Sequence, residues 1–320
     1  MTVDRSESSW SPWPYRIGCP VWSCKAWGDS VYPRGTPPKD SLWWYSRMFA
    51  TVEGNSTFYA VPSREVFQGW AASCSPGFEF CFKFPRGITH EAELLGCEAM
   101  LGVFLERLTV LGQQPCLGPT FLQLSPQFSG RYRQRLEDFL RKLPPQFPWA
   151  VEVRHADWFD EGACERWLDS LLEELGIDRV LFDSRPLYRL PPRDPSEAES
   201  QRRKPRSPWR TTVTSRAPFV RLIGRNRWEE VADFWESWAE QVASWIRQGL
   251  RPRIFTHAPD DAFAPQLARY FHELLKQKFA DLQAANPIPQ LPQLEEARSA
   301  CSESEAGVAR RQRQLKLFED

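Results

Sequence analysis

Several short apolar runs in this sequence end in a residue that can carry a charge or transfer a proton. Thr51-Val52 leads to Glu53, Phe78–Phe82 leads to Lys83, and Trp149–Val151 leads to Glu152. The polar residues that follow runs of this kind are Glu53, Asn55, Ser56, Lys83, Arg86, His90, Gln123, Glu152, Arg154, His155, Asp183, Arg221 and His257. Each residue alone could serve as a helix cap or pin a loop. Gathered around one pocket they would carry a desolvation cost that structural needs rarely explain, so together they indicate a functional site.

The residue types in this set favour chemistry on an anion. Four of them, Lys83, Arg86, Arg154 and Arg221, supply donors that suit a phosphate or a carboxylate. The carboxylates Glu53, Glu152 and Asp183 can act as general bases, while His90, His155 and His257 can shuttle protons or bind a metal.

We therefore predict two groups of site residues. The catalytic candidates are Glu53, Lys83, His90, Glu152, His155 and Asp183. The substrate-binding candidates are Trp22, Asn55, Ser56, Tyr59, Arg86, Gln123, Arg154, Arg221 and His257.

The sequence identifies no cofactor, and we expect no metal. Glu152, Asp183 and a histidine could hold Mn or Zn, but the many nearby cations would oppose another positive centre. Cys19 and Cys24 have no further ligand nearby, and the eight cysteines form no CxxC pair. The chain also has no GxSxG motif, which disfavours acyl transfer.

The elements that must position these residues alternate between strand and helix. Short apolar runs near residues 16–19, 51–52, 78–83, 120–124, 149–153, 179–182, 218–222 and 253–255 predict strands. Most are followed by amphipathic stretches with apolar residues three and four apart, such as Leu101 to Leu111. About eight such repeats without a Gly-rich dinucleotide turn predict an α/β fold, a parallel (β/α)8 barrel, with the site at the carboxyl ends of its strands.

We divide the chain into an N-terminal arm (1–14), a barrel (15–282) and a polar tail (283–320). Within the barrel, residues 185–216 form a Pro- and Arg-rich insertion with no helical periodicity. We predict that this basic loop replaces the helix after the sixth strand, either as a solvated insertion or as an arm for phosphate backbones. Lys plus Arg and Asp plus Glu number 41 each, so no global charge favours nucleic acid. Without a signal peptide or a long apolar segment, we expect a cytoplasmic protein with no membrane partner.

At several of these positions the sequence resembles the DUF72 (YecE-like) family of TIM-barrel proteins. The motifs that carry the resemblance are Ile17-Gly18 with Trp22, Tyr32-Pro33, Glu53 with Asn55–Tyr59, Lys83–Pro85, Ile88–His90, Gln123-Leu124, Val151–His155, Trp158-Phe159, Asp183-Ser184 and Arg221-Leu222. The resemblance covers about residues 16–280 and implies the barrel and the place of its site, but no reaction. Two departures, Ile223 in place of a family histidine and Phe255–Pro259 in place of an Asn-rich run, leave the last two strand ends in question.

The C-terminal pentapeptide has a resemblance of its own. Gln314-Leu315-Lys316-Leu317-Phe318 is similar to the peptide by which bacterial replication and repair proteins dock on the DNA sliding clamp. Leu315, Leu317 and Phe318 can fill an apolar cleft, and Gln314 can hydrogen-bond at its rim. The alternative is a Leu/Phe terminus without a partner.

Two functions follow. The first is an enzyme, a hydrolase or lyase acting on a phosphate-bearing or otherwise anionic substrate, recruited to the clamp for DNA processing or repair. The second is a non-catalytic ligand-binding or adaptor protein recruited in the same way. The sequence does not reveal the substrate, the catalytic base or the oligomeric state.

Overall fold

The computed structural model describes residues 13–280 and 291–297. It contains eight parallel strands in the order β3-β2-β1-β8-β7-β6-β5-β4. Their bounds are β1 Arg16–Cys19, β2 Thr51–Gly54, β3 Glu79–Phe82, β4 Thr120–Gln123, β5 Trp149–Glu152, β6 Asp178–Asp183, β7 Phe219–Ile223 and β8 Arg253–His257. The end strands β3 and β4 meet through isolated bridges from Phe80 to Leu117 and from Lys83 to Phe121. The sheet is thus a nearly closed barrel, and the predicted TIM-like fold is confirmed.

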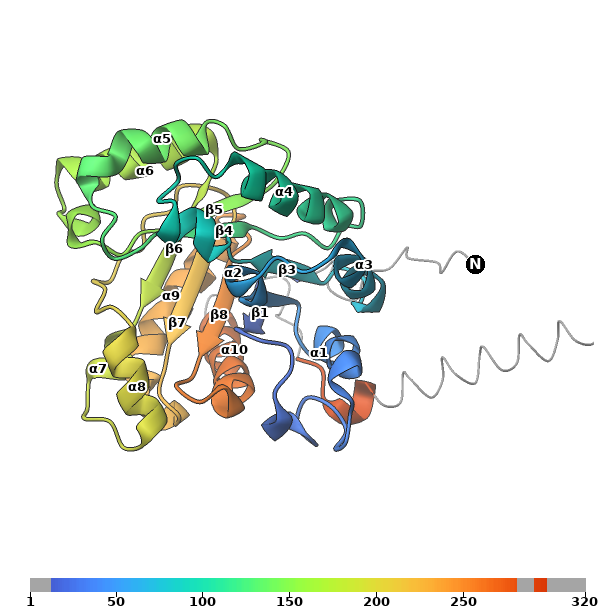
Figure 1. Ribbon diagram of the computed structural model, residues 1–320. Coiled ribbons are helices and arrows are strands. Elements are labelled where there is room, and N and C mark those ends of the chain that lie inside the picture. The colour runs from blue at the N-terminus through green and yellow to red at the C-terminus, as the bar shows by residue number, and fades with distance from the viewer. Residues whose placement is uncertain (1–12, 281–290, 298–320) are drawn as a thin grey trace, which may run out of the picture.

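Helices connect the strands and surround the barrel (Figure 1). The α-helices are α1 Ser41–Met48, α2 Ser56–Tyr59, α3 Arg64–Ser73, α4 Glu98–Gly112, α5 Arg133–Leu140, α6 Ala163–Leu175, α7 Arg185–Tyr188, α8 Pro195–Arg203, α9 Ala232–Arg247 and α10 Ala264–Ala280. Single turns of 3-10 or π type are η1 Lys25–Trp27, η2 Pro38–Asp40, η3 Gly87–Glu91, η4 Gly130–Tyr132, η5 Ala156–Phe159, η6 Trp228–Glu230 and η7 Asp261–Phe263. None of the described helices is both long and apolar enough to cross a membrane.

Hydrophobic periodicity explains how the longer helices form and pack. In α9 the buried side chains of Trp235, Trp238, Val242 and Trp245 recur at steps of three and four residues, so they share one face toward the strands. Helix α6 ends at Gly176, whose φ of 64° places it in the left-handed conformation that terminates a helix at low cost.

Alternate residues along the strands divide the barrel interior into layers. On β3 and just beyond it these residues are Glu79, Cys81 and Lys83, and on β8 they are Arg253, Phe255 and His257. The middle layer is an apolar cluster of Cys81, Phe121, Ala150, Val180, Phe219 and Phe255. Charged groups therefore lie in the barrel both before and after this apolar layer, and those after it are the predicted site residues.

The insertion at 185–216 is more regular than its composition suggested. It contains α7 and α8, which Figure 1 shows at the end of the barrel toward which β7 and β8 point. Helix α8 begins because the Asp194 side chain accepts a hydrogen bond from the Glu197 N–H at 2.9 Å and Pro195 occupies the first turn. The expectation of a segment without helix is therefore wrong, although no long outer helix follows β6.

Residues 291–297 of the expected polar tail pack on the barrel. Leu291, Leu294 and Ala297 are buried in the main core, and Arg269 donates a hydrogen bond to the Pro292 carbonyl at 3.0 Å. Apolar residues spaced three apart let this stretch cover the core despite its polar neighbours. The rest of the tail, including Gln314, Leu315, Leu317 and Phe318, lies outside the described residues, as do the first twelve residues of the N-terminal arm.

Candidate functional site

The centre of the candidate site is Arg221, which lies in the middle of β7 and reaches two carboxylates. Its Nε and Nη2 donate to Glu53 Oε2 and Oε1 at 2.7 and 2.8 Å, and its Nη1 donates to Glu152 Oε2. The Arg221 side chain is only 5% exposed, and those of Glu53 and Glu152 are 0% and 1% exposed. A single guanidinium thus bridges two carboxylates that come from opposite parts of the barrel wall.

Other side chains donate hydrogen bonds to the second carboxylate oxygen of Glu152. Glu152 Oε1 accepts hydrogen bonds from Gln123 Nε2 and Arg154 Nε, both at 2.7 Å. Burial alone would raise the pKa of Glu152, but the charges of Arg221 and Arg154 lower it to about 2. Glu152 is therefore an ionised counterion at neutral pH and a poor general base.

Glu53 has an equivalent environment. Its Oε1 accepts from Asn55 Nδ2 at 2.9 Å, and its Oε2 lies 3.0 Å from His257 Nε2. Although burial opposes ionisation, Arg221 and His257 hold the pKa of Glu53 well below its usual range. Burial lowers the pKa of His257 to about 4, so this ring is neutral at pH 7 and its Nε2 proton points at Glu53.

Lys83 differs from its ionic neighbours because no described carboxylate forms an ion pair with its amine, whereas Glu152 pairs with Arg154 and Arg221. It follows β3 and is 9% exposed, and its Nζ lies 3.5 Å from the centroid of the Phe58 ring. Its main chain is fixed, since its N–H donates to the Gly54 carbonyl and its carbonyl accepts from Thr57 Oγ1 at 2.6 Å. Among the described residues, none accepts a hydrogen bond from Nζ. Burial, followed by the charges of Arg221 and Arg154, lowers the pKa of Lys83 to about 7.

A cavity of about 730 Å³ lies over these groups. Its described lining includes the predicted residues Asn55, Tyr59, Lys83, Arg86, His90, Gln123, Arg154, Arg221 and His257. Glu53 and Glu152 are covered by this lining and lie beneath it.

His90, Arg86 and Tyr59 form one side of the cavity. His90 Nδ1 is 2.8 Å from Thr89 Oγ1, and burial together with the charge of Lys83 lowers the pKa of His90 to about 4. Arg86 makes an exposed ion pair with Glu91 at 3.3 Å, and Tyr59 is 74% exposed. These residues present a neutral imidazole, a cation and an aromatic face to the cavity.

Another part of the lining comes from the insertion, which the sequence analysis did not assign to the pocket. Its lining residues are Ser196, Glu199, Ser200, Arg203 and Lys204. The sequence signal for this wall is the run Arg202-Arg203-Lys204, which lies at the C-terminal end of the helix that Asp194-Pro195 starts. Burial, with a contribution from Arg221, lowers the pKa of Lys204 to about 8.

A buried ion pair holds α8 in this position. Arg225, which follows β7 and is fully buried, donates to Glu197 of α8, and Asn226 Nδ2 donates to Asp194 Oδ2 at 2.9 Å. The cavity wall contributed by α8 is thus attached to the strand that carries Arg221.

Besides Glu53 and Glu152, which lie beneath the cavity lining, four predicted residues are absent from it. Trp22 packs edge-on against Trp70 with ring centroids 5.1 Å apart, and Ser56 is exposed on α2. His155 Nδ1 accepts from the Asp157 N–H at 3.2 Å and caps the η5 turn.

Asp183 is the fourth of these residues, and its bonds give it a structural role. Its Oδ2 accepts from Trp238 Nε1 at 2.7 Å and from Arg185 Nη2 at 2.8 Å, and its Oδ1 accepts from the Arg185 N–H at 2.9 Å. Asp183 therefore joins the first turn of the insertion to α9.

The described residues contain no group of three or more His, Cys, Asp or Glu side chains placed to hold a metal ion. The carboxylates Glu53 and Glu152, which a metal would need, are bound to guanidinium groups.

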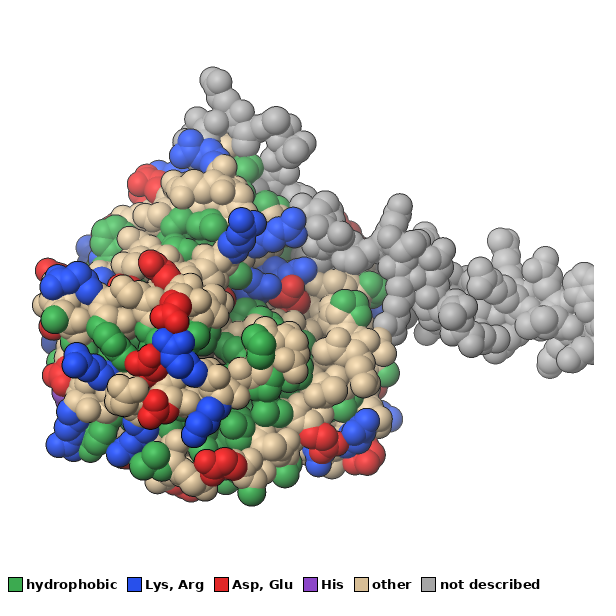
Figure 2. Space-filling view, turned by 90° about the horizontal axis from the view of Figure 1, so that it is seen from above, with side chains coloured by type: hydrophobic (Ala, Val, Ile, Leu, Met, Phe, Trp, Pro, Cys, Tyr) green, Lys and Arg blue, Asp and Glu red, His purple; other side chains and the backbone are tan. Residues whose placement is uncertain are grey.

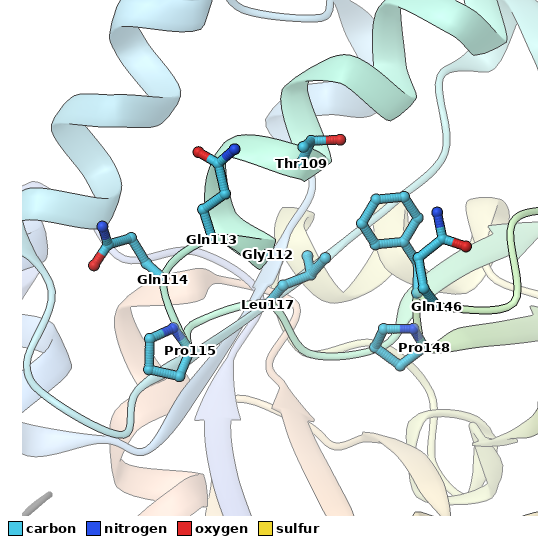
Figure 3. Close-up of a pocket in the computed structure, with 9 residues that line it drawn as sticks. Thr109, Gly112, Gln113, Gln114, Pro115, Leu117, Gln146 and Pro148 are labelled. Atoms are coloured by element: carbon cyan, nitrogen blue, oxygen red, sulfur yellow. The ribbon is translucent and has the colours of Figure 1, made fainter.

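A second cavity, of about 450 Å³, lies near the amino ends of β4 and β5 (Figure 3). Its described lining consists of Thr109, Gly112, Gln113, Gln114, Pro115, Leu117, Gln146, Phe147 and Pro148. None of these side chains is ionisable, so this cavity lacks the groups for acid–base chemistry or anion binding.

Charges on the outer surface are mixed. On the face shown in Figure 2, Lys and Arg side chains are interspersed with Asp and Glu. Arg141, for example, pairs with Glu137 and Glu174, each at 2.8 Å. The excess of cations at the cavity is thus a local feature.

Comparison with known proteins assigns the family. The model of a family described as "Protein of unknown function DUF72" matches residues 16–293. The chain belongs to the DUF72 family. The UPF0759 protein YecE of Escherichia coli K12 is 36% identical over 274 residues, which span 86% of this chain and 97% of YecE. The UPF0759 protein YunF of Bacillus subtilis is 28% identical over 163 residues, which span 48% of this chain and 57% of YunF.

Solved structures of DUF72 proteins share the fold. One from Enterococcus faecalis V583 superimposes with a TM-score of 0.62 at 18% identity, covering 86% of this chain and 98% of the other. One from Thermotoga maritima MSB8 gives a TM-score of 0.59 at 21% identity, covering 84% and 99%. The resemblance predicted from the sequence motifs is therefore confirmed, and it brings a fold but no reaction.

Proposed function

We propose that this DUF72 protein is an enzyme that binds a phosphate-bearing substrate in the cavity at the carboxyl ends of its strands. The observation that carries the proposal is the charge of the described lining. Its cationic side chains are Lys83, Arg86, Arg154, Arg203, Lys204 and Arg221, and its acidic ones are Glu199 and Asp261. Glu199 is itself paired with Arg202 and Arg203. An anionic ligand would offset this local excess of positive charge.

The geometry favours distinct roles for these groups. Arg154, Arg203 and Lys204 would bind the anion, because all three line the cavity and their carboxylate partners are shared. Arg154 shares Glu152 with Arg221, Arg203 shares Glu199 with Arg202, and no described carboxylate forms an ion pair with Lys204. Glu53 and Glu152 would act as counterions that hold Arg221 rigid, in place of the base role predicted from sequence. Lys83 would transfer the proton, since a group with a pKa near the working pH both releases and accepts protons readily. A hydrolase or a lyase would use such a set.

Binding can be tested before a substrate is known. Calorimetric titration with pyrophosphate should show binding by the wild-type protein. Affinity should fall about tenfold, or about 1.4 kcal/mol, in Arg154→Gln and in Lys204→Met. Lys39→Met, an exposed lysine outside the cavity, serves as the matched control and should bind normally. Absence of pyrophosphate binding by the wild type would contradict the proposal.

Turnover should depend on Lys83. On a panel of phosphoesters, nucleotides and nucleic acids, Lys83→Met should lose activity by at least about a hundredfold while retaining pyrophosphate binding. If wild type and Lys83→Met were equally inactive on every compound yet bound anions, the non-catalytic ligand-binding alternative would gain support.

We also propose that the C-terminal peptide recruits the protein to the sliding clamp. The support is the sequence Gln314-Leu315-Lys316-Leu317-Phe318, separated by residues 298–313 from the stretch that packs on the barrel. A short linker of this kind would raise the local concentration of the barrel at the clamp. A place in DNA processing or repair would follow from this recruitment.

Direct binding to the clamp of the source organism tests this part. Surface plasmon resonance should detect the wild type, and Leu315→Ala with Phe318→Ala should abolish the signal. Lys83→Met should bind the clamp normally, because it leaves the tail unchanged. Equal absence of binding in wild type and the double variant would remove the recruitment proposal and leave the cavity proposal intact.

The insertion contributes less to DNA binding than its composition suggested. Arg185 pairs with Asp183, Arg189 with Asp233, and Arg210 with Glu165. These pairs leave Arg203 and Lys204 at the cavity as the cations of this segment best placed for a phosphate. Contact with a DNA backbone would thus occur at the cavity and not along a free basic arm.

A further inference from the structure

The environment of Lys83 suits a nucleophilic amine. Lysine side chains inside proteins normally pair with a carboxylate, which keeps them charged. The nearby carboxylates Glu53 and Glu152 instead bind Arg221, and the Lys83 amine faces the Phe58 ring and the cavity. Two guanidinium groups, those of Arg221 and Arg154, oppose a third positive charge here. The amine therefore spends much of its time uncharged, with its lone pair available.

The other groups around the cavity are poorer nucleophiles. Cys81 lies beneath the site in the apolar layer, and burial raises the pKa of its thiol to about 12. Ser196 donates its hydroxyl proton to Asp194 Oδ1 at 2.6 Å. Ser200 faces the cavity, but no described residue acts as its general base. Lys204 is the other amine of the described lining, and its pKa of about 8 lies above the value of about 7 for Lys83. Lys83, which also lies at the end of a barrel strand, is therefore the better placed nucleophile.

We propose that Lys83 forms an imine with an aldehyde or ketone that carries a phosphate group bound by Arg154, Arg203 and Lys204. This inference rests on the proposed function and names the substrate class of the same cavity. The neutral amine of Lys83 attacks the carbonyl carbon, and the new C–N bond pushes the C=O electron pair onto oxygen. A proton transferred from nitrogen to oxygen gives a carbinolamine. Protonation of its hydroxyl and loss of water then leave the protonated imine.

The overall step balances without an oxidant or a metal. One carbonyl compound and one lysine ammonium give one protonated imine and one water. The positive imine draws electrons from the adjacent carbon, so a neighbouring C–H or C–C bond can break heterolytically. A lyase of this kind fits a site in which Glu53 and Glu152 are bound to Arg221 and whose lining includes the weakly basic groups Lys83, His90 and His257.

Reductive trapping of a phosphate-bearing aldehyde tests the proposal. The full-length protein is incubated with pyridoxal 5′-phosphate, reduced with borohydride and digested, and the modified lysines are mapped by mass spectrometry. The expected result is a dominant adduct on Lys83 that forms at least about tenfold faster than with pyridoxal, which lacks the phosphate. Pyrophosphate should slow the labelling.

Variants separate the imine from simple lysine modification. Lys83→Met and Lys83→Arg should both lose the dominant adduct, although Lys83→Arg keeps a cation at this position. Lys39→Met should label as the wild type does, and circular dichroism establishes that each variant is folded. A dominant adduct on Lys204, or labelling spread evenly over exposed lysines, would overturn the assignment of Lys83.

The two proposals fail in different ways. Pyrophosphate binding without an adduct on Lys83 would overturn imine formation and leave anion binding standing. Failure of the wild type to bind pyrophosphate, together with equal labelling by pyridoxal and its phosphate, would overturn both.

Discussion

Ion pairs lie at both ends of this barrel, on either side of one apolar layer. At the amino ends of the strands, Arg16 and Arg253 both donate to Glu79 at 2.8 Å, and Asp178 accepts from Ser215. At the carboxyl ends, Arg221 bridges two carboxylates beneath the cavity.

The ends differ in how their charges are compensated. At the amino end, two arginines pair with Glu79, and burial raises the pKa of the nearby Asp178 to about 7. At the carboxyl end, none of the carboxylates in the described part of the chain forms an ion pair with Lys83, which faces the cavity together with further cations. The ion pairs at the amino end thus have a structural role, whereas those at the carboxyl end lie beneath a candidate site. The Lys83 amine, which pairs with no described carboxylate, distinguishes the carboxyl end.

Replacing Arg221 at the carboxyl end and Arg253 at the amino end should give the largest difference in the free energy of unfolding. Arg221→Met would leave both Glu53 and Glu152 buried without their shared counterion. We expect it to lower the free energy of unfolding by about 3–5 kcal/mol. Arg253→Met should cost about 1.5–3 kcal/mol, because Glu79 keeps Arg16. Equilibrium urea unfolding measures both, and equal losses would contradict the difference drawn between the two ends.

The pH dependence of stability should differ between the ends as well. The pKa of Asp178 rises from its usual 3.8 to about 7 in the folded protein. Its contribution is therefore fully present below about pH 4 and is lost as the pH rises through 7. Asp178→Asn should remove this loss, on the order of 1–3 kcal/mol, when unfolding is measured at about pH 5 and about pH 8. An unchanged pH dependence would show that Asp178 is ionised in the fold.

Glu152 should show the opposite trend at the carboxyl end. Its folded pKa of about 2 lies below its usual 4.5, so its contribution is present above pH 4.5 and is lost as the pH falls toward 2. Asp178→Asn should leave this acidic limb of the stability curve unchanged, which provides an internal control.

A smaller effect is expected when one of the charges near Lys83 is removed. Arg154 is one of the charges that lower its pKa, after burial and Arg221. Arg154→Gln should raise the pKa of Lys83 by about one unit or less, since burial and Arg221 remain. Competitive labelling of the amine as a function of pH measures this shift. A fall in the pKa would show that Arg154 acts on Lys83 through a rearrangement and not through its charge.

The smallest effect should come from a surface pair in the insertion. Arg189 contacts Asp233, and their side chains are 46% and 71% exposed. Arg189→Met should change the free energy of unfolding by about 0–1 kcal/mol, because solvent screens such pairs. This variant sets the baseline for the arginines inside the barrel. A loss comparable to that of Arg221→Met would mean that the insertion is integral to the core.

The sequence predicted the strands and most of the cavity because both depend on local patterns. Apolar runs that end in Glu53, Lys83, Gln123 and Glu152 mark strand ends, and parallel strands bring those ends together. Ion pairs between distant strands of the barrel produce no such local sequence pattern. The sequence could not show that Arg221 engages Glu53, 168 residues away, and so removes it from the candidate bases.

Composition was misleading in the insertion. The Pro- and Arg-rich stretch indicated a solvated loop, but Asp194 caps a helix there and Glu197 reaches the buried Arg225 after β7. That long-range ion pair orders α8 and places Lys204 at the cavity. His155 and Asp183 have the residue types of catalytic groups, yet their bonds to η5 and to Arg185 place them outside the cavity lining.

The most direct test of the account is the titration of the Lys83 amine in the folded protein. Pulse labelling with isotopic acetic anhydride from about pH 5 to about pH 11, followed by mass spectrometry, gives the fraction of unprotonated Lys83 at each pH. We expect the labelling of Lys83 to have its midpoint near pH 7, well below the usual lysine pKa of 10.5. A midpoint at or above 10.5 would mean that Lys83 stays charged at neutral pH, which would contradict its roles in proton transfer and imine formation.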